Sequence, residues 1–263
     1  MKYNKILLFF GVGLVVSTVL RVLQLWFTIE DQTGFFNHDF NDFGIYILII
    51  ILLFTIATAV FCLISHRRPD HPPKSNPILS VCSLLLSVSL LVELFTEKFS
   101  DLVNGWQISF LKIFGFLTAA FFVYFAYKEK YGTKYLKYLI IIPSLYVVFR
   151  IIYNFSAISA LAIISDNLIF TASYCAVLLF MISFAKLYNG VESETNFRKL
   201  MATGLSAGIL CVSQPLAYLI YNAFTGFSYL HTSLMANISL LVFGFFILTF
   251  VFLHFSRENA CNS

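Results

Sequence analysis

Arg21 is a charged residue inside the first long apolar segment of the chain, and it shares one helical face with three polar neighbours. Ser17, Gln24 and Thr28 lie at steps of three or four residues along this segment. Side chains at that spacing project from the same side of an α-helix. A charge near the middle of a bilayer is unfavourable by roughly 2.5–3.5 kcal/mol on insertion scales. We therefore expect this polar face to point into protein or a hydrated cavity.

Arg150 repeats the pattern in the second half of the chain, with Tyr146 and Asn154 four residues to either side. Six further ionisable or amide residues fall near the ends of other apolar segments. We expect all of them in the outer part of the membrane and group them with Arg21, Gln24 and Arg150 as one candidate binding site, called the polar layer. The six are Asp42, Glu93, Lys112, Asp166, Gln214 and Asn237.

The polar layer is nearly balanced in charge, and this balance suggests three functions. Ionisable groups buried in membranes usually pair with one another and often mark the path of a substrate or an ion. The first function is binding or transport of a small polar or charged solute through a charged pocket. The second is a membrane sensor or assembly subunit, in which the charges form a closed structural network. The third is an intramembrane lipid-modifying enzyme with Glu93 or Asp166 as its acid or base.

Sequence motifs of common enzymes are absent. The chain contains no H-E-x-x-H, G-x-S-x-G, Walker or G-x-G-x-x-G motif, and its five cysteines form no C-x-x-C pair. The histidines do not follow a standard metal-ligand spacing. We therefore expect no catalytic residue, no metal and no cofactor. The expected partners are the lipid bilayer and a small-molecule ligand, and the net charge of +4 does not indicate nucleic acid because it arises from short connectors.

The elements that position these residues are expected to be membrane-spanning helices. Of 263 residues, 59% are hydrophobic and 11% are charged, whereas a typical soluble domain has about 25% charged residues. About 20 apolar residues cross the ~30 Å core of a bilayer. The sequence predicts one all-α, polytopic transmembrane domain, residues 1–263, with eight spans near residues 6–27, 44–64, 78–95, 108–127, 135–153, 167–185, 200–221 and 234–255.

Basic residues predict the orientation of these spans. All but four of the 17 lysines and arginines lie at the two termini or in every second connector. Positively charged connectors stay on the cytoplasmic side, so both termini are expected in the cytoplasm, with the protein in the plasma (inner) membrane.

The polar layer also suggests a duplicated four-helix unit. Its members pair by halves at separations of about 125 residues, and two units of four spans would be related by an axis along the membrane normal. Evenly spaced helices with polar outer ends would give the same offsets without duplication. The pairs are Arg21 with Arg150, Asp42 with Asp166, Glu93 with Gln214, and Lys112 with Asn237.

Small residues and prolines predict local packing. Gly204 and Gly208 form a G-x-x-x-G step that lets another helix approach closely. Pro143 and Pro215 each leave a carbonyl four residues earlier without its helical donor, which favours a kink.

Overall fold

The computed structural model describes residues 3–28, 41–64, 76–97, 103–128, 136–157, 165–189, 194–225 and 233–261. These residues form helices and no strand, which confirms the all-α class. The helices are α1 (Tyr3–Phe27), α2 (Asn41–Ile64), α3 (Pro77–Thr96), α4 (Gly105–Lys128), α5 (Leu136–Leu139), α6 (Ile141–Ala157), α7 (Ser165–Tyr188), α8 (Glu194–Thr225) and α9 (Leu234–Cys261).

Seven of the described helices are long and apolar enough to cross a membrane, which is compatible with a multi-pass membrane protein. The fifth predicted span differs, because it is divided into the short helix α5 and the 17-residue apolar helix α6. Pro143 lies in the first turn of α6 and has no N–H to donate to the carbonyl of Leu139, so the helix is interrupted just before it. An eighth crossing by this segment stays a prediction.

Local hydrogen bonds fix where α3 and α9 begin and where α3 ends. The side chain of Asn76 accepts a hydrogen bond from the N–H of Ile78 at 2.9 Å, and Pro77 occupies the first helical position. Ser233 caps α9 by accepting from the N–H of Ala236 at 3.0 Å. Both residues satisfy N–H groups that a helix start leaves without partners. At its other end, α3 stops at Glu97.

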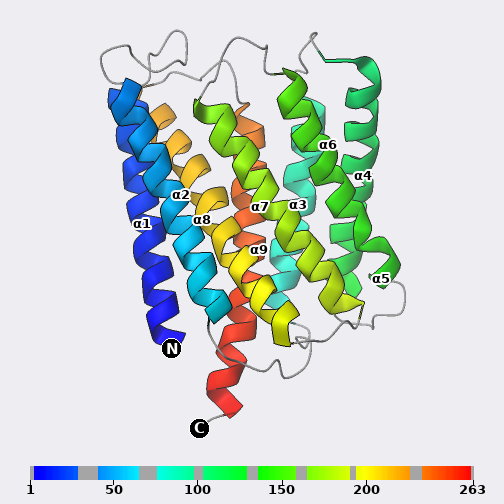
Figure 1. Cartoon of the computed structure of the whole chain (residues 1–263). Helices are drawn as coiled ribbons and strands as arrows, with labels where there is room; N and C mark the ends of the chain where they lie inside the picture. Colours follow the sequence, from blue (N-terminus) through cyan, green and yellow to red (C-terminus); the bar gives the residue numbers. More distant parts are fainter. Residues whose placement is uncertain are drawn as a thin grey trace.

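Six helices form a closed ring in which each packs against the next: α3, α4, α6, α7, α8 and α9. The pair α1 and α2 packs against α8, at one side of the bundle in Figure 1. The start of α1 and the end of α9 lie at the same end of the bundle (Figure 1). The cytoplasmic location of that end stays a prediction.

The G-x-x-x-G step of α8 brings α9 into close contact, as predicted. A Cβ atom added at Gly204 would lie 2.6 Å from Cγ2 of Val251, and one at Gly208 would overlap the side chain of Leu248. Since only a hydrogen atom fits at either position, the two helices approach closely along this face.

The interior of the ring divides into an aromatic part and a polar part. Buried rings from the second halves of α4 and α7 and from the middle of α9 contact one another, with centroids 5.1 Å apart for Phe122 and Phe246 and 4.8 Å apart for Phe184 and Phe250. Buried charged residues lie instead in the second halves of α3 and α6. Because α4 and α7 run opposite to α3 and α6, these two parts occupy opposite halves of the ring.

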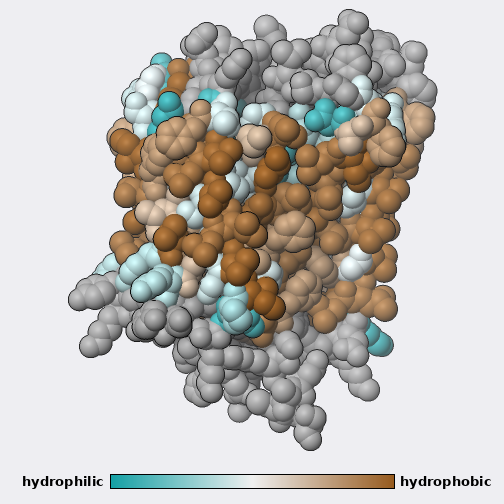
Figure 2. All heavy atoms as spheres, turned by 180° about the vertical axis from the view of Figure 1, so that it is seen from behind, coloured by the Kyte–Doolittle hydropathy of each residue, from teal (hydrophilic) through white to brown (hydrophobic). Residues whose placement is uncertain are grey.

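The outer surface carries a continuous apolar band on the face shown in Figure 2, with more polar residues above and below it. Among the large apolar side chains that the described helices expose are Leu8, Leu53 and Phe95, with 69%, 58% and 76% of their surface exposed. Such a band suits contact with lipid tails, whereas a soluble protein rarely exposes so large an apolar area.

Candidate functional site

Arg21 lies at the centre of a hydrogen-bonded cluster that joins α1, α2 and α8. Its Nε donates to Oε1 of Gln214 at 2.6 Å, and its Nη1 donates to Oε1 of Gln24. Gln24 then donates from Nε2 to the backbone carbonyl of Gly44 at 2.7 Å. The side chains of Arg21 and Gln24 are completely buried, so the polar face predicted on α1 points into protein.

This α1 cluster resembles a structural network more than an open site. The guanidinium and the Gln24 amide both use hydrogen bonds that cross between helices. Two buried atoms beside them, Oγ of Ser17 and Nε2 of Gln214, have no hydrogen-bond partner among the described residues. A mostly satisfied polar network of this kind fixes how neighbouring helices pack.

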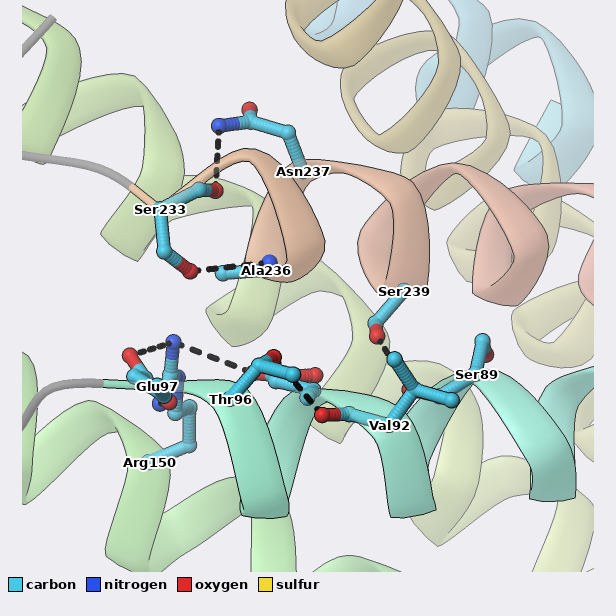
Figure 3. Close-up of polar contacts among 10 residues, drawn as sticks. Ser89, Val92, Thr96, Glu97, Arg150, Ser233, Ala236, Asn237 and Ser239 are labelled. Carbon is cyan, nitrogen blue, oxygen red and sulfur yellow. Dashed lines mark hydrogen bonds and ion pairs between the residues drawn. The ribbon is translucent and has the colours of Figure 1, made fainter. Parts of the chain in front are cut away.

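Arg150 lies in a second cluster, inside the six-helix ring, where it contacts two carboxylates of α3. Its Nη1 and Nη2 donate to Oε2 and Oε1 of Glu97 at 2.5 and 2.8 Å, a two-pronged pair drawn in Figure 3. Its Nη2 also lies 3.1 Å from Oε1 of Glu93. Arg150, Glu93 and Glu97 have side chains that are 2%, 0% and 8% exposed. We call these three residues the Arg150 cluster.

The helical period places both carboxylates on one side of α3. Glu93 and Glu97 are four residues apart, so their side chains project from the same face. The backbone N–H of Glu97 donates to the carbonyl of Glu93 at 2.8 Å, which keeps the last turn of α3 helical up to the cap. Arg150 approaches them from α6, which α4 separates from α3 in the ring.

Aromatic rings surround the guanidinium of Arg150. Its Cζ lies 5.4 Å from the ring centroid of Tyr153, 5.9 Å from that of Phe170 and 5.8 Å from that of Tyr174. Contacts within about 6 Å stabilise a cation through the negative face of the ring. The arginine is therefore held by an ion pair on one side and by π-faces on others.

Glu93 is the least satisfied member of the Arg150 cluster. Neither of its carboxylate oxygens accepts a hydrogen bond from the described residues, and the same is true of the buried hydroxyl of Tyr146. Both Tyr146 and Tyr174 interact electrostatically with Glu93. The hydroxyl of Ser239 is also within reach of Glu93, but it donates to the backbone carbonyl of Ser89 at 3.0 Å. Buried polar atoms in native structures usually have partners, so this carboxylate is an exception.

The charges of the Arg150 cluster do not balance when every group is ionised. One guanidinium faces two carboxylates, and Glu97 already uses both of its oxygens on Arg150. An uncompensated carboxylate in a medium of low polarity is strongly unfavourable. The cluster therefore favours one additional positive charge, either a proton or a cation, beside Glu93.

The two clusters contain five of the nine predicted site residues, in two separate sets of hydrogen bonds and ion pairs. Asn237 is completely buried but points to the opposite side of α9 from Ser239, and it donates to the carbonyl of Ser233 at 3.2 Å (Figure 3). Lys112 differs from the prediction, because its side chain is exposed on the same face of α4 as Phe116. The side chains of Asp42 and Asp166, in the first turns of α2 and α7, lie outside the described residues.

Glu97 is the site residue that sequence reasoning left out of the polar layer. It lies two residues beyond the predicted end of the third span, at residue 95. The available signal was the four-residue step from Glu93, which places both carboxylates on one helical face.

Each of the two arginines contacts a residue in the other half of the chain. Arg21 contacts Gln214, and Arg150 contacts Glu93, so each arginine from the first helix of one proposed unit meets the third helix of the other. Helix packing is less regular, because α7 packs against α8 while the corresponding helices α2 and α3 make no extensive contact within the described residues. The duplication stays a prediction.

The described residues contain no group of three or more His, Cys, Asp or Glu side chains that is arranged to hold a metal ion. No protein-family model, curated protein or solved structure matches the chain.

Proposed function

We propose that this protein is a multi-pass plasma-membrane protein that binds and transports a small, positively charged solute at the Arg150 cluster. The observation that carries this proposal is the carboxylate of Glu93, which is fully buried and accepts no hydrogen bond from the described residues. Ionisable groups at membrane depth are unfavourable unless they serve a pairing or a function. Arg150 is already paired with Glu97, so pairing alone does not account for Glu93.

The sign of the solute charge follows from the same geometry. An anion at this site would face two carboxylates, whereas a cation would bring the cluster to neutrality. Aromatic rings beside the guanidinium also favour cations over anions. The charged pocket predicted from the sequence is thus expected around Glu93, within the ring.

The second candidate function, a closed structural network, suits the α1 cluster better than the Arg150 cluster. Arg21 and Gln24 are engaged in hydrogen bonds that cross between helices. We propose that these residues hold α1 and α2 against α8 and do not contact the solute. The lipid-modifying alternative is disfavoured for Glu93, because its side chain is 0% exposed and does not reach the lipid-facing surface.

Thermal unfolding of the purified protein tests the binding proposal. We would measure the midpoint with methylammonium, guanidinium, tetramethylammonium, sodium or potassium as chlorides, and with sodium acetate or phosphate, all at equal ionic strength. A cation that occupies the site at 100 times its Kd stabilises the folded state by about 2.7 kcal/mol. We expect stabilisation by at least one cation in the wild type and none in Glu93→Gln.

The matched control is Ser87→Ala, which removes a buried hydrogen bond from the same helix, to the carbonyl of Ala119 at 2.9 Å. It should lower stability slightly and keep the response to cations. Stabilisation by sodium acetate or phosphate beyond that by sodium chloride, or an equal cation response in Glu93→Gln, would contradict the proposal. Uptake of labelled methylammonium into proteoliposomes then separates transport from binding alone.

The orientation is proposed from the distribution of basic residues, with both termini in the cytoplasm. Reporters fused after Asp39 and after Lys74 test it. The first should report an external position and the second an internal one.

A further inference from the structure

We infer that Glu93 exchanges a proton for the cationic solute, so that the protein couples solute movement to proton movement in the opposite direction. This inference rests on the proposed function and adds a coupling ion to it. The geometry that supports it is the sharing of one guanidinium by two buried carboxylates.

Glu97 is the carboxylate that makes hydrogen bonds to Arg150. Glu97 contacts Nη1 and Nη2 at 2.5 and 2.8 Å, and this bidentate arrangement is the strongest form of arginine pairing. Glu93 contributes only an electrostatic contact, at 3.1 Å and without a hydrogen bond. The pair of Arg150 and Glu97 is therefore neutral by itself, and Glu93 is the group left over.

Arg150 and several acidic or hydroxyl groups face the carboxylate of Glu93. Within the described residues, α3 contributes Glu97, α6 contributes Arg150 and Tyr146, and α7 contributes Tyr174. From α9 comes only the hydroxyl of Ser239, and on α4 the side chain of Lys112 is exposed at the surface. Arg150 is thus the one described residue of these helices that brings a positive charge to this carboxylate.

The low polarity of the interior disfavours an uncompensated negative charge on Glu93. A buried carboxylate without a counter-charge either takes up a proton or is compensated by a cation. The proton and the cation would occupy the same carboxylate oxygens, so Glu93 can be neutralised by only one of them at a time. With methylammonium as the solute, the carboxylic acid of Glu93 releases its proton to water and the resulting carboxylate binds CH3NH3+. One O–H bond of the carboxyl group breaks, one O–H bond forms in the hydronium ion, and the total charge is conserved.

The choice of solute follows from the atoms that lack partners. The two carboxylate oxygens of Glu93 accept no hydrogen bond from the described residues and interact electrostatically with Tyr146, so they suit a cation that carries several N–H groups. Methylammonium has three, and tetramethylammonium has none. Sodium and potassium bring no N–H groups, and the described residues hold no cluster of ligands for a metal ion.

Proton release during binding tests the exchange. Methylammonium chloride is added to the purified protein in weak buffer with a pH indicator, and binding is followed in parallel by thermal shift between pH 5 and pH 9. We expect one proton released per methylammonium bound wherever Glu93 starts protonated. The apparent affinity should rise roughly tenfold per pH unit in that range and level off above it.

Infrared difference spectroscopy gives a second readout that does not depend on stability. The wild type should lose the carbonyl band of a protonated carboxyl group when methylammonium is added, Ser87→Ala should behave in the same way, and Glu93→Gln should show no such loss. Methylammonium binding that is independent of pH, with no proton released and no change in the band, overturns the exchange and leaves the proposed function intact. A lack of stabilisation by every cation tested overturns the proposed function, and the exchange with it.

Discussion

Sharing of Arg150 between Glu93 and Glu97 predicts strong non-additivity when the two carboxylates are removed. Glu97→Gln removes the bidentate pair, but the amide oxygen still accepts one hydrogen bond and Glu93 lies 3.1 Å from the same guanidinium. Because Glu93 takes over the charge, we expect a loss of about 1–2 kcal/mol in the free energy of unfolding. Glu93→Gln removes the excess carboxylate and should change stability by less than about 1 kcal/mol.

The double variant removes both counter-charges and leaves Arg150, only 2% exposed, without any carboxylate of the cluster. Removing all partners from a buried charge destabilises proteins by about 3–5 kcal/mol. The sum of the single changes is no more than about 2–3 kcal/mol, so the interaction energy should be about 2 kcal/mol. The double variant should lose more stability than the two single variants together, because each carboxylate can substitute for the other only if both reach the same guanidinium.

Equilibrium unfolding in mixed micelles, with SDS as the denaturant and circular dichroism as the readout, measures all four proteins of this cycle. Ser87→Ala again serves as the control, since its hydroxyl bonds to α4 at a distance from the charges. Additive losses in the double variant would show that the two glutamates act independently, and the shared arginine would no longer explain their burial.

Three further outcomes are expected, each read from the thermal unfolding midpoint or from unfolding in mixed micelles. Gly208→Ala should destabilise the protein by about 1–3 kcal/mol because its Cβ has no room against α9. Gly11→Ala is the control: its Cβ would meet nothing within 4 Å, so it should stabilise the protein by roughly 0.5–1 kcal/mol. Equal effects of the two substitutions would contradict the close packing of α8 against α9. Arg21→Met should destabilise by about 3 kcal/mol through lost charged hydrogen bonds while the response to methylammonium persists, and loss of that response would place Arg21 in the binding site. Thr118→Val removes a buried hydroxyl without a hydrogen-bond partner among the described residues and should be neutral or stabilising, in contrast to Ser87→Ala, which loses about 1 kcal/mol with its hydrogen bond.

The helical architecture was determined largely by the sequence. Seven of the eight predicted spans appear as single helices with the length and hydropathy of a span, and the fifth is divided between α5 and α6. This follows because a backbone in lipid must satisfy its own hydrogen bonds, so composition over about 20 residues is enough to specify a helix. The burial of Arg21 was also predictable, since the helical period places its polar neighbours on the same face.

The partners of these residues were decided only by the tertiary structure. Period and hydropathy show which face of a helix is polar, but not which neighbouring helix that face meets. The sequence pattern therefore predicted one site, whereas the fold divides the polar layer into the α1 cluster around Arg21 and the Arg150 cluster. Lys112 followed the same sequence pattern, yet its face of α4 is turned outward.

Glu97 illustrates the physical reason most directly. Its sequence position marks the end of a span, where an acid ordinarily faces water. In the ring α6 lies one helix away from α3, beyond α4, and the guanidinium of Arg150 reaches both Glu97 and Glu93. The sequence thus determined that charges would be buried, and the packing of α3 against its neighbours decided that the Glu93 carboxylate would accept no hydrogen bond from the described residues.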